Sequence, residues 1–114
     1  QGIRDFVNEA DRPILATPRI LQDAGIPFAI TAQEIRDEES LIRQAMIATR
    51  FGLPADAAMS AVTTNAAKLL GLGDGAGTIK SGGDADLVVW TGDPLSATSR
   101  VKTVVIGGIV VYER

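Results

Sequence analysis

The sequence changes its pattern near Leu72, and this change constrains the fold more than any other feature. Before Leu72, apolar residues recur at helical spacing, whereas after it short apolar runs alternate with glycine-rich turns. The pattern predicts an α/β chain in two parts, residues 1–71 and 72–114. In the second part, strands are expected at residues 86–90, 101–106 and 109–112.

A pair of glycines, Gly107-Gly108, separates the last two expected strands. Two-residue hairpin loops need positive φ angles, which glycine adopts without a steric penalty. The pair therefore predicts a β-hairpin turn at residues 107–108.

The first part contains three kinds of local signal. A short helix over residues 18–24 is expected to end at Gly25, and the apolar run IPFAIT that follows predicts a strand covered on both faces. Further helices are expected behind caps at Asp37 and at Thr63 or Thr64, and Pro54 is expected at the first position of the helix between them. The expected ranges are 26–31 for the strand and 38–51, 54–62 and 64–70 for these helices.

Composition excludes most kinds of active site. The 114 residues suffice for one domain, but they include no His and no Cys. The chain therefore has no imidazole base, no thiolate nucleophile and none of the side chains that most zinc sites use. We expect no catalytic or metal site built from these residues alone.

Charge and hydropathy limit the partners. The net charge is −3 and no basic stripe is evident, so we expect no nucleic acid partner. The apolar runs are shorter than the roughly 18 residues that a membrane span needs, and the first residues do not resemble a signal peptide. We expect a soluble protein that does not enter a membrane, with the cytoplasm slightly favoured over the periplasm.

Three features resemble sites but have simpler explanations. The glycine-rich GLGDGAG at residues 71–77 follows a helix, whereas phosphate-binding loops follow a strand, so a connecting turn is favoured. Asp84 and Asp86 are too few ligands for a hard cation, and a turn that leads into a strand is favoured. Trp90 and Tyr112 are expected to pack in a β layer rather than bind a ligand.

Three ordered segments carry a family resemblance. TTNAAKLLGL begins at Thr63, GTIKSGGDADLVVWTGDPL begins at Gly77, and VKTVVIGGIVVYER begins at Val101. Together they resemble the C-terminal end of the amidohydrolase superfamily, in its imidazolonepropionase-like and prolidase-like branch. The upstream AGIPFAIT and FGLPADAAMSAVT are also similar to that family, and the resemblance weakens before Pro18.

The resemblance implies a larger enzyme. Family members combine a metal-dependent (β/α)8 barrel with a small β-sandwich formed by both chain ends. By resemblance, residues 1–71 would be the end of the barrel, with its last strand at 26–31. Residues 72–114 would be the C-terminal share of the sandwich, and the full-length enzyme would carry a divalent metal such as zinc.

The resemblance also identifies a departure at the metal site. After the last barrel strand the family has an Asp that binds metal and activates water, and Gln33 stands at that position. A neutral amide cannot accept the water proton. Glu34 is a weaker alternative, because a shift of one residue along a strand changes the face of the side chain.

Two functional hypotheses follow. In the first, the chain is the C-terminal portion of a protein that hydrolyses carbon–nitrogen bonds of cyclic amides, amidines or peptide-like substrates, and is inactive alone. In the second, it is a non-catalytic interaction or structural module derived from that C-terminus. In both, exposed apolar strands are expected to be covered by the remainder of the barrel or by self-association into a homo-oligomer.

Overall fold

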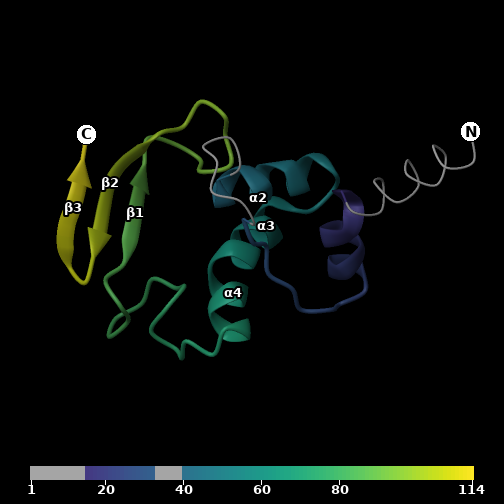
Figure 1. Ribbon diagram of the computed structural model, residues 1–114, viewed down its shortest axis with the longest axis horizontal. Coiled ribbons are helices and arrows are strands. Elements are labelled where there is room, and N and C mark those ends of the chain that lie inside the picture. The colour runs from purple at the N-terminus through teal and green to yellow at the C-terminus, as the bar shows by residue number, and fades with distance from the viewer. Residues whose placement is uncertain (1–14, 33–39) are drawn as a thin grey trace, which may run out of the picture.

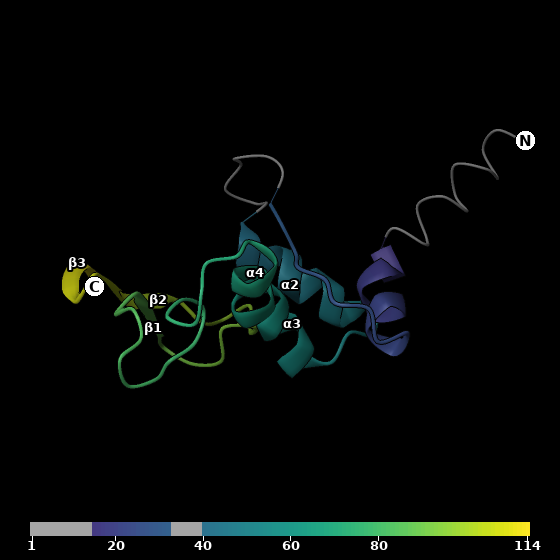
Figure 2. The ribbon, with the colours of Figure 1, turned by 90° about the horizontal axis from the view of Figure 1, so that it is seen from below.

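The computed structural model describes residues 15–32 and 40–114. Within them, residues 15–23 are helical, three further helices follow, and a three-stranded sheet ends the chain. Two views at right angles show the helices at one side and the sheet at the other (Figures 1 and 2). The labelled elements are α2 (Leu41–Arg50), α3 (Ala55–Val62), α4 (Thr64–Leu69), β1 (Leu87–Trp90), β2 (Val101–Ile106) and β3 (Ile109–Glu113).

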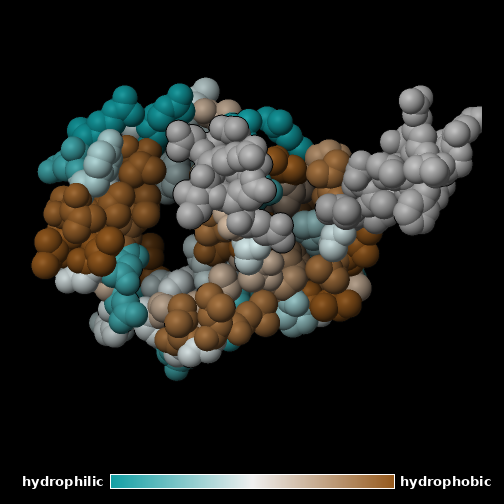
Figure 3. Space-filling view, in the orientation of Figure 1, coloured by the Kyte–Doolittle hydropathy of each residue, from teal (hydrophilic) through white to brown (hydrophobic). Residues whose placement is uncertain are grey.

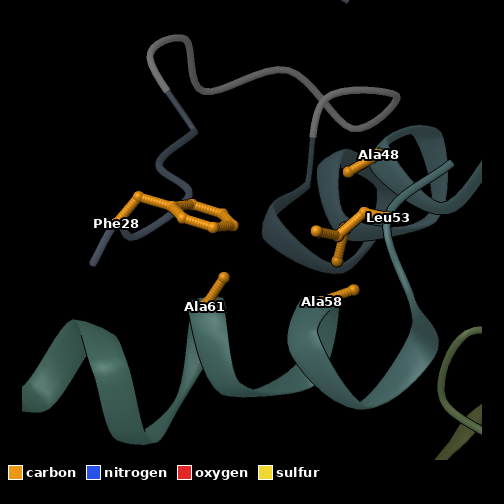
Figure 4. Packing of buried hydrophobic residues seen from close by; sticks show 6 residues of the cluster. Phe28, Ala48, Leu53, Ala58 and Ala61 are labelled. Carbon is orange, nitrogen blue, oxygen red and sulfur yellow. The ribbon is translucent and has the colours of Figure 1, made fainter. Parts of the chain in front are cut away.

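The core of the described chain lies among the helices and is built mainly from alanine. Ala45 and Ala48 are three residues apart on α2, so they share one face, and Ala58 and Ala61 do the same on α3. All four are buried, and such small side chains allow the two helices to approach closely. Leu53 and Phe28 complete this cluster (Figure 4).

Residues 26–31 differ from the expected strand. The structure assigns no strand there, and the segment runs alongside α3 with one backbone hydrogen bond, from the Ile30 N–H to the Ala61 carbonyl (3.0 Å). Phe28 is buried, but Ile26 is 51% exposed, so the segment is not covered throughout. A strand requires neighbouring strands, and the described chain places none beside this segment.

The helix caps also differ in detail from the expectation. Ser40 caps α2 by accepting a hydrogen bond from the Arg43 N–H, whereas the expected cap Asp37 lies outside the described residues. Thr63 precedes α4 but does not cap it with its side chain. Its hydroxyl instead donates to the Met59 carbonyl (2.6 Å), which ties the start of α4 to α3.

The sheet is antiparallel with strand order β1-β2-β3. Gly107 and Gly108 have φ angles of 58° and 80° and form the two-residue turn between β2 and β3, with Ile106 paired to Ile109. The Asp86 carboxylate accepts a hydrogen bond from the Gly107 N–H (2.8 Å), and the Ala85 carbonyl accepts one from the Gly108 N–H (3.0 Å). The residues before β1 thus hold the hairpin turn in place.

The sheet buries far less than the helices do. None of its strand residues is buried, and every residue of β3 is exposed. Figure 3 shows a broad hydrophobic surface over these strands. The large apolar or aromatic strand residues that are exposed are Val88, Val89, Ile106, Ile109, Val110, Val111 and Tyr112.

Two loops, one between α4 and β1 and one between β1 and β2, pack against the helices. Leu95, between β1 and β2, packs against the helical core. Gly77, between α4 and β1, passes so close to α4 that an added Cβ would lie 2.6 Å from the Thr63 carbonyl oxygen. These contacts position the sheet beside the helices.

Candidate functional site

The position that the family resemblance singles out lies at the edge of the described chain. Thr31 and Ala32 are exposed and close the described segment, while Gln33 and Glu34 lie outside the described residues. The structure therefore leaves the roles assigned to Gln33 and Glu34 as sequence-based expectations.

An apolar cleft of about 740 Å³ lies between the helices and the sheet. Figure 3 shows the molecule hollowed between these two parts. The helices contribute Leu41, Met59 and Val62, and the sheet contributes Leu87 and Trp90. The lining is mainly aliphatic, so the cleft offers a surface for apolar groups rather than for reaction chemistry.

Asp84 and Asp86 also line this cleft, but both contribute to the local backbone structure. The Asp86 carboxylate accepts the Gly107 N–H, as described above, and the Asp84 N–H donates to the Gly75 carbonyl (2.8 Å). Gly75 and Gly77 belong to the glycine-rich segment 71–77, which connects α4 to the residues before β1. Turns at residues 74–75 and 81–82 precede β1, which matches the simpler interpretation of the glycine-rich segment and of the turn that leads into a strand.

The described residues do not assemble a metal site. Across residues 15–32 and 40–114, no three side chains of the ligand types His, Cys, Asp and Glu come together. The sequence as a whole has no His and no Cys. A divalent metal in such a position would lack the usual nitrogen and sulfur ligands, so this part of the chain does not fit the metal centre that the resemblance implies.

A second hollow, which the sequence analysis missed, lies at the end of the sheet near Trp90. It measures about 620 Å³ and gathers the basic residues Arg100, Lys102 and Arg114. Arg100 and Lys102 lie at the start of β2, and the pairing of β3 with β2 brings Arg114 beside them, so no single linear motif contains all three. Among the helices of the described part, none is long and apolar enough to cross a membrane.

Comparisons with known proteins agree with the arrangement of helices and strands. The amidohydrolase family model matches residues 12–111. The structure is similar to the crystal structure of an amidohydrolase from Thermotoga maritima MSB8, with a TM-score of 0.81, 37% identity, and coverage of 88% of this chain and 26% of that chain.

Curated relatives show the same relation in sequence. Amidohydrolase tasK of Hapsidospora irregularis is 34% identical over 83% of this chain and 10% of its own length. Imidazolonepropionase of Thermoplasma volcanium is 30% identical over 84% of this chain and 26% of its own length. The chain thus spans about a quarter or less of these relatives. With a family model matched over nearly its whole length, an α/β structure and several relatives that share the same segments, this chain belongs to the amidohydrolase family.

Proposed function

We propose that this chain is the C-terminal portion of a metal-dependent hydrolase of carbon–nitrogen bonds. The observation that carries the proposal is the structural match to the Thermotoga amidohydrolase, which uses 88% of this chain but only 26% of the other. Coverage this high includes both helices and strands, so their relative placement is similar in the two proteins. The remaining three quarters of that relative have no counterpart in this chain.

In this proposal, the two parts of the chain belong to different parts of the parent enzyme. Residues 1–71 are the end of a (β/α)8 barrel, and residues 72–114 are strands of the composite β-sandwich. Residues 26–31 become the last barrel strand once neighbouring strands are present. That segment is neither helix nor turn, and the hydrogen bond from the Ile30 N–H to the Ala61 carbonyl holds it against α3, which supports this interpretation.

The catalytic metal of the parent enzyme would be held upstream of this chain. No His or Cys is available here, and Gln33 replaces the expected Asp. The substrate would be a cyclic amide, an amidine or a peptide-like molecule, and imidazolone propionate is the first candidate because several curated relatives are named imidazolonepropionase. No catalytic step is assigned to residues of this chain.

The test compares this 114-residue chain with the product of the longer reading frame that contains it. We expect the longer protein to bind a divalent metal and to hydrolyse imidazolone propionate or another cyclic amide, an amidine or a peptide-like substrate. This activity should be lost when a chelator removes the metal. The 114-residue chain is expected to show neither turnover nor stoichiometric metal by elemental analysis. A longer protein without metal and without turnover would contradict the proposal, as would chelator-sensitive hydrolysis by the short chain.

The alternative is a non-catalytic interaction module, and one observation favours it. The exposed apolar residues of the sheet form a surface that isolated soluble proteins rarely present without a partner. The remainder of the barrel would cover this surface in the enzyme, whereas self-association would cover it in a module. A metal-free longer protein that still associates through the sheet would favour the module.

A further inference from the structure

The groove at the end of the sheet gathers positive charge in a chain whose net charge is negative. It lies where β1 ends, β2 begins and β3 ends, at the upper end of the sheet in Figure 1. Its lining contains three basic side chains and no Asp or Glu, although the chain as a whole has a net charge of −3. The complete lining is Val89, Trp90, Thr91, Arg100, Lys102 and Arg114.

Arg100 is held in place by a set of short hydrogen bonds. The Thr91 N–H donates to the Arg100 carbonyl and the Arg100 N–H donates to the Thr91 hydroxyl oxygen, both at 2.9 Å. The Arg100 Nη1 donates to the carbonyls of Ala97 (3.1 Å) and Ser99 (3.0 Å). A guanidinium has five N–H groups, so this arrangement orients the side chain and leaves donors on Nε and Nη2 for a ligand.

An irregularity in the sheet places Lys102 at the groove, and a backbone hydrogen bond places Arg114 beside it. Val89 pairs with Thr103 and Trp90 pairs with Val101, so Lys102 is the extra residue of a β-bulge. Bulges redirect side chains and are frequent beside functional sites. The Arg114 N–H donates to the Lys102 carbonyl (2.9 Å), which fixes the two residues side by side.

The three cations have no acidic partners in the described chain. The described residues contain one salt bridge, between Arg19 and Asp23 on the first helical stretch, far from the groove in sequence. Three like charges around one hollow give a positive potential that favours an anion between them. An oxyanion would satisfy them through charge-assisted hydrogen bonds, for which the arginine fork is well suited.

The groove also has an apolar side. Trp90 is half-buried and Val89 lies next to it, so an aromatic surface adjoins the three cations. We propose that this groove binds a small phosphate monoester, with the phosphate among Arg100, Lys102 and Arg114 and the apolar part of the ester on Trp90. A phosphate monoester carries a charge of about −1.5 to −2 at pH 7, which suits three cations better than a single carboxylate does. This inference is independent of the hydrolase assignment.

The chain provides its own probe, because Trp90 is its only tryptophan. Phenyl phosphate titrated into the 114-residue protein at low ionic strength is expected to change the Trp90 fluorescence saturably, and added KCl is expected to weaken binding. Inorganic phosphate is expected to bind more weakly, because it has no group to place on the indole. A ten-nucleotide oligothymidylate serves as the comparison for a nucleic acid ligand.

Charge-removing variants locate the site. Arg100→Gln and Lys102→Gln are each expected to raise the Kd for phenyl phosphate about tenfold, as expected for loss of a hydrogen bond to a charged group. Arg43→Gln and Lys80→Gln remove the same charge outside the groove and are expected to leave the Kd unchanged. Arg100→Lys keeps the charge but loses the fork, so it should give an intermediate Kd, and circular dichroism checks that each variant is folded.

Four results would overturn the proposal. They are no saturable change with the wild-type protein, equal weakening by the groove and control variants, equal affinity for inorganic phosphate and phenyl phosphate, and tighter binding of the oligothymidylate than of phenyl phosphate.

Discussion

The helices and the sheet bury their side chains in opposite ways. The helices use small residues that are almost completely buried, such as Ala45, Ala58 and Ala61 at 0% exposure. The sheet uses large β-branched residues and leaves them accessible, with Ile109 at 68% and Val111 at 56% exposure. Large aliphatic side chains contribute most to stability when they are buried. The exposed side chains of the sheet therefore contribute little to the stability of this chain, and they would contribute more if another layer of protein covered them.

This difference indicates which part of the chain has a buried core of its own. The helical core closes on itself because Ala, Leu53 and Phe28 fill the space between α2, α3 and the segment 26–32. The sheet gains little from the helices, since α2, α3 and α4 pack on each other and the strands pack on each other. A further layer of protein would bury the sheet, in agreement with a chain that spans about a quarter of the relatives' length.

The largest expected effect comes from truncating the one large aliphatic side chain of the helical core. Leu53 is 2% exposed and lies between Ala48 and Ala58 (Figure 4), so Leu53→Ala leaves a cavity that alanine neighbours cannot fill. We expect it to lower the free energy of unfolding by about 2–5 kcal/mol, measured by urea denaturation at one protein concentration.

The matched control truncates a similar side chain in the sheet. Val110 is 54% exposed, so Val110→Ala is expected to change the free energy of unfolding by less than about 0.5 kcal/mol. Equal losses from the two substitutions would break the comparison, because they would show that the sheet contributes as much buried apolar surface as the helices.

A smaller effect, the difference between two glycine variants, is expected at the junction between the helices and the sheet. Gly77 and Gly73 both have positive φ, but an added Cβ meets nothing within 4 Å at Gly73, whereas at Gly77 it meets the Thr63 carbonyl oxygen at 2.6 Å. Both alanine substitutions incur the backbone penalty of about 1–2 kcal/mol. Gly77→Ala is expected to incur about 1–3 kcal/mol more, because backbone has to move.

Thermal unfolding of the two glycine variants measures this difference directly. If Gly77→Ala and Gly73→Ala lower the Tm equally, the close contact between the loop and α4 does not hold the sheet against the helices, and the junction is looser than the structure describes.

Local signals in the sequence were sufficient for much of the fold. The turn at Gly107-Gly108 depends on the φ angles of two residues, and the faces of α2 and α3 depend on spacing within one helix, so both follow from short stretches. The expected strand at 26–31 is not formed, since strand pairing depends on neighbours that this chain does not supply. The apolar pattern of residues 26–31 could not show whether neighbouring strands are present.

The candidate sites also divide into features that depend on local sequence and features that depend on strand pairing. For Asp84 and Asp86 the sequence favoured a turn that leads into a strand, and the structure has a turn at residues 81–82 followed by β1 from Leu87. The groove was not foreseen, and Trp90 was expected only to pack. The basic residues of the groove come together through the β-bulge at Lys102 and the pairing of β3 with β2. The position of this bulge could not be predicted from the amino-acid composition of the strands.

The smallest effect on stability, and the sharpest test of the sheet as an incomplete surface, is expected from Val110→Lys. The wild-type chain has a mass of 11.9 kDa, and light scattering at micromolar concentration is expected to give a larger mass, because the apolar strand β3 is entirely exposed at the edge of the sheet. A lysine there opposes edge pairing and should shift the protein toward monomer, while the free energy of unfolding changes by less than about 0.5 kcal/mol at an exposed position. Leu70→Lys adds the same charge at a residue that is 73% exposed at the end of α4, and it should leave the mass unchanged. A wild-type chain that is monomeric and unfolds cooperatively would contradict this expectation and would show that the exposed sheet needs no partner.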